Sequence, residues 1–155
     1  MLHSEKGVSA VEFALIAPLL FVLTLGVIEF ALLLFDKAVI TNASREAARA
    51  AIVYNTSGTD YLPLSVDEIK TVVKDYANGY LINLGSSGST EISDGDIDIA
   101  YEGPTTPGNP ESGGDVIITV TYGYNFLVFP DMMNLLGESF TGEIPIVGTT
   151  RMRME

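Results

Sequence analysis

The dominant pattern in the chain is a long apolar run that begins close to its N-terminus. Residues 13–35 contain a single ionisable side chain, Glu29, and residues 36–53 continue with many alanines and with no glycine or proline. About 20 apolar residues in a helix suffice to cross a bilayer, and lipid offers backbone groups no hydrogen-bond partner. The pattern therefore predicts one long helix over residues 8–54, of which the apolar part spans a membrane.

The pattern changes after residue 55. Ser65 and Glu68 have the spacing of a helix-capping box, with Leu64 and Ile69 placed as a hydrophobic staple. We therefore predict a second, short helix from Ser65. Its apolar stripe, which we assign to the core and not to a ligand site, consists of Val66, Ile69, Val73, Tyr76, Ala77 and Tyr80.

Three later segments alternate between apolar and polar positions, which is typical of antiparallel strands. Residues 85–89 and 103–114, rich in glycine with serine or proline, are predicted loops. We expect a small sheet whose apolar face packs on the long helix, hence an α+β fold. The apolar positions are Ile97, Ile99 and Tyr101 in the first segment; Val116, Ile118, Val120, Tyr122 and Tyr124 in the second; and Ile144, Ile146, Met152 and Met154 in the third.

Charge separates the two parts of the chain. The formal net charge is -12, and residues 55–155 hold most of the acidic side chains. An acidic surface repels nucleic-acid phosphates and anionic headgroups, so neither is an expected partner of this region.

Composition also disfavours an enzyme. The chain has no cysteine and one histidine, His3, so the usual general base and nucleophile pairs are missing beyond that residue. No spacing of carboxylates indicates a catalytic pair, and we expect no enzyme, no cofactor and no small-molecule substrate.

Three aspartates raise the possibility of a calcium loop, namely Asp94, Asp96 and Asp98. An EF-hand needs glycine at its sixth position and glutamate at its twelfth, where this chain has Ile99 and Thr105. In a strand, alternate aspartates line the solvent face. We expect no metal site, and calcium binding is left open.

The start of the long helix carries a costly charge. A carboxylate at membrane depth costs on the order of 2.5 kcal/mol or more, so Glu12 needs a shallow position or a partner. A secretory signal peptide and an uncleaved signal anchor leave this residue unexplained. The string Gly7-Val8-Ser9-Ala10-Val11-Glu12-Phe13 resembles the type IV prepilin cleavage motif, in which a prepilin peptidase cuts after the glycine. The resemblance makes residues 1–7 a leader and places the cleaved bond between Gly7 and Val8.

Cleavage gives Glu12 a physical role. The new α-amine of Val8, in the same or a neighbouring subunit, could pair with this carboxylate where packed helices exclude water. We expect Val8, Glu12 and the adjacent Phe13 to act in subunit pairing. The alternative is that Glu12 is solvated at the membrane interface.

Further positions on the helix are candidates for packing or ion pairs. A kink is expected at Pro18, which lacks a backbone N–H. Glu29 is either a functional carboxylate inside the membrane or a residue near its outer interface. Arg45 and Arg49 could clamp a carboxylate on a partner or on the acidic region, or could be solvated, and Glu46 can pair with Arg49.

Two blocks on this helix carry a family resemblance. Val11 to Pro18 reads Val-Glu-Phe-Ala-Leu-Ile-Ala-Pro, and residues 43–51 read Ala-Ser-Arg-Glu-Ala-Ala-Arg-Ala-Ala. The chain resembles the TadE-like family, pseudopilins of the tight-adherence (Tad) pilus. The family often has glycine where this chain has Ala47, and the end of the chain, residues 152–155, is also similar to the family.

The resemblance implies a pilin-like architecture: an N-terminal transmembrane helix as spine, a small antiparallel sheet as head and a second short helix. It divides the chain into residues 1–7, 8–54 and 55–155. It implies a minor pilin or pseudopilin, held in the bacterial inner membrane with an extracytoplasmic head or incorporated in an extracellular pilus. The implied partners are the membrane, the prepilin peptidase, other pilins and the pilus assembly platform, and the implied role is adhesion. The alternative is a membrane-anchored extracytoplasmic binding domain that never polymerises.

Overall fold

A computed structural model describes most of the chain. The described residues are 2–53, 55–57, 60–62, 64–85, 90–103, 105, 108, 110–130, 134, 137 and 142–154. The predicted loop over residues 85–89 lies outside them apart from Gly85. The elements are α1 (Leu2–Ile52), β1 (Asn55–Ser57), β2 (Asp60–Leu62), α2 (Val66–Ala77), the 3-10 turn η1 (Asp94–Asp96), β3 (Ile97–Glu102), β4 (Asp115–Asn125) and β5 (Glu143–Arg153).

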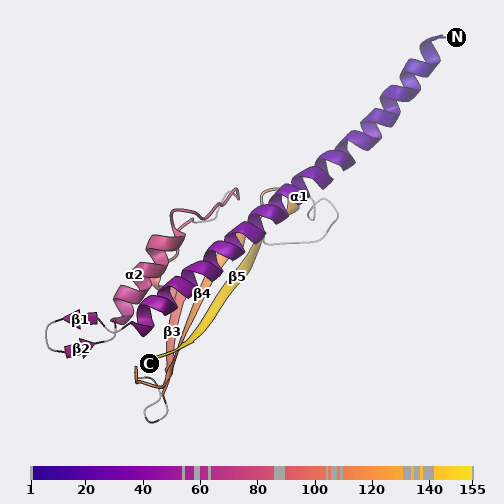
Figure 1. Cartoon of the computed structure of the whole chain (residues 1–155). Helices are drawn as coiled ribbons and strands as arrows, with labels where there is room; N and C mark the ends of the chain where they lie inside the picture. Colours follow the sequence, from indigo (N-terminus) through magenta and orange to yellow (C-terminus); the bar gives the residue numbers. More distant parts are fainter. Residues whose placement is uncertain are drawn as a thin grey trace.

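The helix α1 is the spine of the molecule, as predicted. It is continuous over 51 residues, from Leu2 to Ile52, which corresponds to about 75 Å at 1.5 Å per residue. Its N-terminal part projects away from all other elements, and its C-terminal part lies along the sheet (Figure 1). The spine therefore has one half that projects from the described part of the head and one half that is packed into it.

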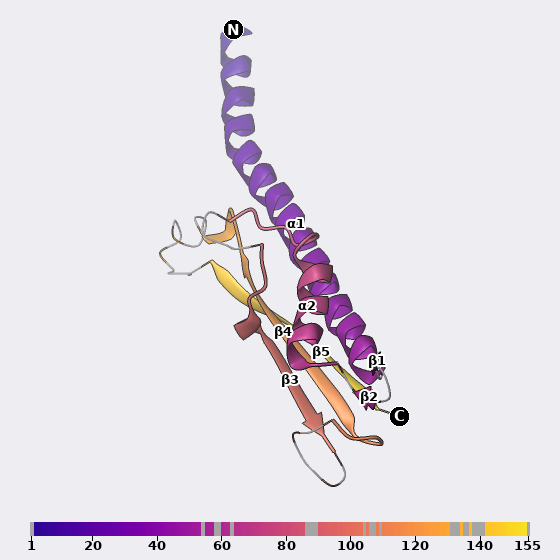
Figure 2. The ribbon, with the colours of Figure 1, turned by 90° about the vertical axis from the view of Figure 1, so that its left-hand side faces the viewer.

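The three predicted strands form one antiparallel sheet in the order β3-β4-β5. β4 is the central strand, and it pairs Ile118 with Ile99 on one side and with Thr150 on the other. The sheet lies against α1, with its strands running roughly alongside the helix (Figures 1 and 2). The structure thus confirms the α+β fold.

The core lies between α1, α2 and one face of the sheet. Alternate residues of β4 are buried, and they meet a strip of small residues on α1 that includes Ala43 and Ala47. Gly148 of β5 allows the closest approach, because a Cβ at this position would lie 2.9 Å from Ile40 Cγ2 and 3.0 Å from the carbonyl carbon of Ile40. Small residues on both elements therefore let the helix backbone approach the sheet.

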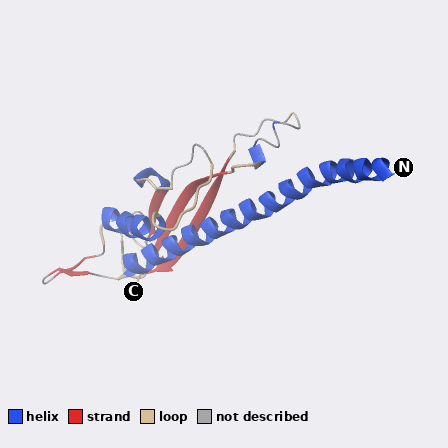
Figure 3. Ribbon diagram, turned by 90° about the horizontal axis from the view of Figure 1, so that it is seen from above, coloured by secondary structure: helices blue, strands red, loops and turns tan. Residues whose placement is uncertain are grey.

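The helix α2 begins where the sequence predicts. Ser65 Oγ accepts a hydrogen bond from the backbone N–H of Glu68, and Glu68 Oε2 accepts one from the backbone N–H of Ser65 at 2.8 Å. The bonds that Glu68 Oε2 accepts from the backbone N–H and the hydroxyl of Ser65 lower the pKa of the Glu68 carboxyl. α2 then packs against α1, at the side of the sheet (Figure 3).

The predicted core stripe of α2 is wrong at its edges. Ile69, Val73 and Ala77 are buried, but Tyr80 is 61% exposed and Tyr76 is also exposed. Val66, at the first position of the helix, is exposed as well. A 12-residue helix packed on one neighbour buries only the residues one turn apart on a single line.

Two further predictions need correction. The segment between α1 and α2, for which the sequence predicts no strand, contains two short antiparallel strands, β1 and β2, with Ser57 opposite Asp60. In β5, Ile144 shares the alternation of Ile146 but is exposed, because β5 is an edge strand and Ile144 lies next to its first residue.

Candidate assembly interface on the long helix

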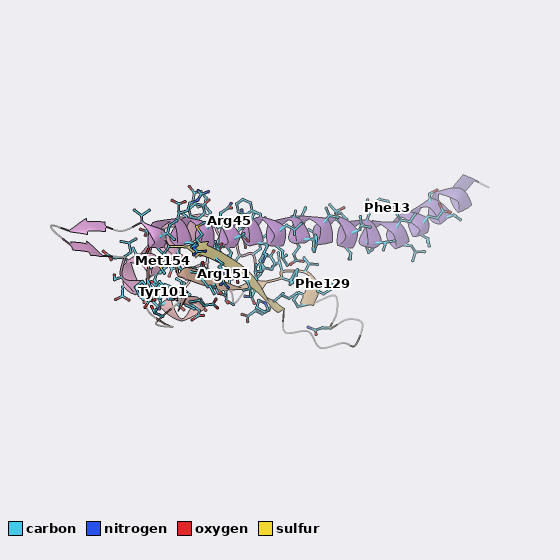
Figure 4. All side chains as sticks on the ribbon, turned by 60° about the horizontal axis from the view of Figure 1, so that its bottom comes forward. Phe13, Arg45, Tyr101, Phe129, Arg151 and Met154 are labelled. Carbon is cyan, nitrogen blue, oxygen red and sulfur yellow. The ribbon has the colours of Figure 1, made fainter. Side chains whose placement is uncertain are left out.

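The projecting part of α1 is an apolar surface without a partner among the residues that the structure describes. Phe13 and Leu15 are 73% and 74% exposed, and the apolar side chains from Val8 to Ile28 are exposed throughout. Figure 4 shows Phe13 far from the labelled residues of the head. A surface of this size in water would be an interaction site by default, so it requires lipid or other helices around it.

The residues of the leader motif lie on this surface. Gly7 is helical and exposed, and a Cβ there would meet nothing within 4 Å. Val8 and Glu12 are one helical turn apart on the same face, and helical side chains lean towards the N-terminus. The Glu12 carboxylate therefore leans towards the position that a free amine of Val8 would occupy. Glu12 is exposed and makes no ion pair with any residue that the structure describes.

Pro18 does not interrupt the helix, which is continuous through this position. Figures 2 and 3 show α1 curved, with its N-terminal part inclined to the remainder. A proline removes one hydrogen bond from the helix and favours such bending. Farther along, Thr24 donates its hydroxyl hydrogen to the carbonyl oxygen of Leu20 at 2.8 Å, which leaves no free polar group on this side chain.

The charged block near the end of α1 faces away from the sheet. Arg45, Glu46 and Arg49 are exposed, whereas Ser44 and Ala47 beside them are buried. Arg49 and Glu46 form an ion pair at 3.8 Å, and the charges of Arg45 and Arg49 point to solvent. This placement keeps both arginines available to another molecule and directs them away from the chain's own acidic head.

Glu29 is covered by the head, a contact that the sequence did not indicate. It is only 6% exposed, because the segment after β4 covers it. Its Oε1 atom accepts hydrogen bonds from the backbone N–H groups of Leu127 and Val128, the latter at 3.1 Å. Tyr124 donates its hydroxyl hydrogen to the carbonyl oxygen of Glu29 at 3.2 Å. The residue thus ties the head to the spine.

Tyr124 supports the same junction. Its ring is 1% exposed and packs edge-on against Phe126, with 5.1 Å between the ring centroids. Burial, followed by the nearby carboxylate of Glu29, raises the pKa of Tyr124 to about 12. The hydroxyl therefore stays protonated at neutral pH and remains a hydrogen-bond donor.

Asp36 is a buried carboxylate that the sequence analysis did not single out. It is 0% exposed, and its Oδ1 accepts a hydrogen bond from the backbone N–H of Ile82 at 3.1 Å. Its Oδ2 has no hydrogen-bond partner among the described residues. Burial raises the pKa of this carboxyl, and the bond from Ile82 partly opposes the rise. A signal existed in the sequence, since Asp36 lies three and four positions before the buried pair Val39 and Ile40.

The three aspartates considered for calcium point to separate partners. Asp94 Oδ1 lies 2.6 Å from Lys74 Nζ, which lowers the pKa of this carboxyl. Asp96 Oδ2 accepts bonds from the backbone N–H and the hydroxyl of Ser93, and Asp98 is exposed. Within the described part of the chain, no group of three or more potential ligands could hold a metal ion.

Comparisons with known proteins find a similarity that is confined to the long helix α1. One described helix, Gly7–Ile52, is long and apolar enough for a single membrane span. No curated protein and no solved structure matches the chain. A family model described as "TadE-like protein" matches residues 7–49. The match does not extend to residues 152–155, where the sequence also resembles the family. Over this segment, which holds the glycine–glutamate motif, Glu29 and the arginine block, the chain is similar to TadE-like proteins.

Proposed function

We propose that this chain is a minor pilin or pseudopilin that assists assembly of a Tad pilus, a type IV-like pilus that mediates surface attachment. The match to the TadE-like family indicates a Tad pilus-associated protein, and the finer assignment rests on the helix. We further propose that a prepilin peptidase cuts between Gly7 and Val8. The acting parts are then surfaces for binding other subunits, and the chain is not an enzyme.

One observation carries this proposal. The glycine and glutamate of the leader motif lie on a helix half that has no contact with the described part of the head, while the other half of the same helix is packed into the core. Gly7 is open to a peptidase, with nothing within 4 Å of a Cβ at this position. An ordinary membrane anchor needs neither an exposed glycine here nor the carboxylate of Glu12 five residues later.

The proposed assembly step uses the Val8 amine and Glu12. After cleavage the amine is cationic near neutral pH, and such a partner stabilises a carboxylate that is buried among packed helices. Phe13 and the apolar residues that follow supply the surface on which neighbouring helices pack. The outward-facing arginines, Arg45 and Arg49, are candidates for contacts with a carboxylate of the assembly platform or of another subunit.

The proposal places the protein in a bacterial inner membrane, spanning it once with the head outside the cytoplasm. The test is the mass of the mature N-terminus in cells with and without the prepilin peptidase. A chain that begins at Val8 only when the peptidase is present supports the proposal. A chain that keeps Met1 in both strains favours a membrane-anchored binding domain that does not polymerise.

A further inference from the structure

The end of the head nearest the projecting helix carries exposed apolar side chains. They come from three separate segments of the head and gather around α1 at the level of Glu29. We call this set the collar. Its members are Leu84 in the segment after α2, Leu127 and Phe129 after β4, and Ile144 at the start of β5.

The collar is firmly attached to the spine. The carboxylate of Glu29 accepts hydrogen bonds from the backbone N–H groups of Leu127 and Val128. The ring centroids of Phe129 and Phe126 lie 5.6 Å apart. Leu84 lines a smaller hollow against α1 together with Leu25, Ile28 and Leu127. These contacts hold apolar side chains outward at a fixed height on the helix.

The collar is open to its surroundings. Leu127 is 50% exposed and Leu84 is 49% exposed. Between the collar and α1 there is an open hollow of about 350 Å³, lined by Gly26, Glu29, Phe30, Phe126, Phe129 and Ile144. Glu29, the one ionisable side chain among the described residues of this lining, accepts hydrogen bonds from the backbone of the head.

The height of the collar matches the outer boundary of a bilayer. From Val8 to Glu29 α1 rises about 31 Å at 1.5 Å per residue, and the hydrocarbon core of a bilayer is about 30 Å thick. If the helix spans the membrane from Val8, the collar lies where hydrocarbon meets headgroups. Figure 4 shows Phe129 on the end of the head that faces the projecting helix.

We propose that the collar inserts into the outer interface of the lipid bilayer, so that the head rests on the membrane before assembly. The apolar surface is continuous with the exposed face of the spanning helix, which makes lipid the occupant that the observations favour over a second protein. This inference depends on the membrane span of the proposed function, but it does not depend on cleavage after Gly7. Its consequence is that extraction of the subunit must remove two contacts with lipid, the helix and the collar.

The sequence allows a direct test, because the chain contains no tryptophan. Three variants each carry a single tryptophan at one position. The substitutions are Leu127→Trp in the collar, Leu19→Trp in the spanning helix and Val53→Trp at the distal end of α1. Leu19 and Val53 are 68% and 62% exposed, so each position tolerates a larger side chain as the collar position does. The full chain is placed in zwitterionic phosphatidylcholine vesicles, since the acidic head would be repelled by anionic lipid.

Lipids with bromine near the headgroup end of the acyl chain should quench Leu127→Trp, and lipids with bromine near the methyl end should quench Leu19→Trp. Neither should quench Val53→Trp. Quenching of Leu19→Trp without quenching of Leu127→Trp overturns the collar and leaves the membrane span intact. A Leu127→Trp signal that is shielded from aqueous acrylamide but not quenched by lipid also overturns it, since protein would then cover the collar. Loss of quenching at Leu19→Trp would instead refute the span itself.

Discussion

The carboxylate of Glu29 accepts a hydrogen bond from the backbone N–H of Val128 at 3.1 Å, although the two residues lie almost 100 positions apart in the chain. This contact joins the spine to the head where the covered half of α1 begins. It converts a charge that would be costly in lipid into a structural acceptor. Glu29 therefore adds a polar contact to the apolar packing that holds the head on the spine.

Replacing Glu29 by alanine should destabilise the head. The N–H groups of Leu127 and Val128 would lose their acceptor, which costs on the order of 2 kcal/mol. Glu29→Gln keeps one acceptor oxygen and should lose less. Thermal unfolding in detergent, followed by the tyrosine signals of the head, measures this. Glu12→Ala is the matched control with no expected effect, and a Glu29→Ala variant as stable as the wild type would contradict the role.

Asp36→Asn should change how stability depends on pH. Burial raises the pKa of Asp36 above its ordinary value of 3.8, so the folded state binds a proton at a pH where the unfolded state has lost it. Wild-type stability therefore falls as pH rises from about 4 through the raised pKa. Asparagine cannot ionise, so the variant should gain stability relative to the wild type at pH 7 compared with pH 4.

The comparison uses melting temperatures at both pH values. Asp98→Asn is the matched control, because Asp98 is exposed and should show no such gain. If the stability of Asp36→Asn depends on pH in the same way as that of the wild type, burial does not raise the pKa of Asp36, and the account of this residue is wrong.

Gly148→Ala should loosen the contact between β5 and α1. The added Cβ would lie 2.9 Å from Ile40 Cγ2 and 3.0 Å from the carbonyl oxygen of Ile40, so the helix backbone must move. Overpacking of this kind costs about 1–3 kcal/mol, measured as a loss of unfolding free energy. Gly79→Ala, with nothing within 4 Å of the new Cβ, should be close to neutral. Equal effects of the two changes would refute the close approach.

Glu12→Ala should abolish incorporation of the subunit into pili while leaving its abundance in the membrane unchanged. Glu12→Gln should fail similarly, since the proposed partner is the cationic amine of Val8. Glu46→Ala removes an exposed carboxylate of the same helix and serves as the control. The readout is the amount of the subunit in sheared pilus fractions, and normal incorporation of Glu12→Ala would refute the pairing.

Local patterns in the sequence predicted the elements well. The capping box at Ser65 and Glu68 is formed, and the alternation from Val116 to Tyr124 gives the central strand. These features depend on residues that are close in the chain. The same reasoning overestimated the burial of Tyr80, because periodicity indicates a face but not how much of it a neighbour covers.

The junction between spine and head was not predictable in this way. The partners of Glu29 are backbone groups near residue 127, and the partner of Asp36 is the backbone of Ile82. Every residue except proline has a backbone N–H, so the sequence does not indicate which of these donors will bind a carboxylate. Long-range packing decides which of them come close enough. The hairpin of β1 and β2 was missed because three-residue strands are too short for a period-two pattern.

Processing after Gly7 is the central claim, and the mass of the mature N-terminus tests it most directly. We predict a chain that starts at Val8 in cells with the peptidase, and loss of this product in Gly7→Val. Gly26→Val, at an equally open position of the same helix, should still be cut. A wild-type chain that retains Met1 although the peptidase is active would contradict the account.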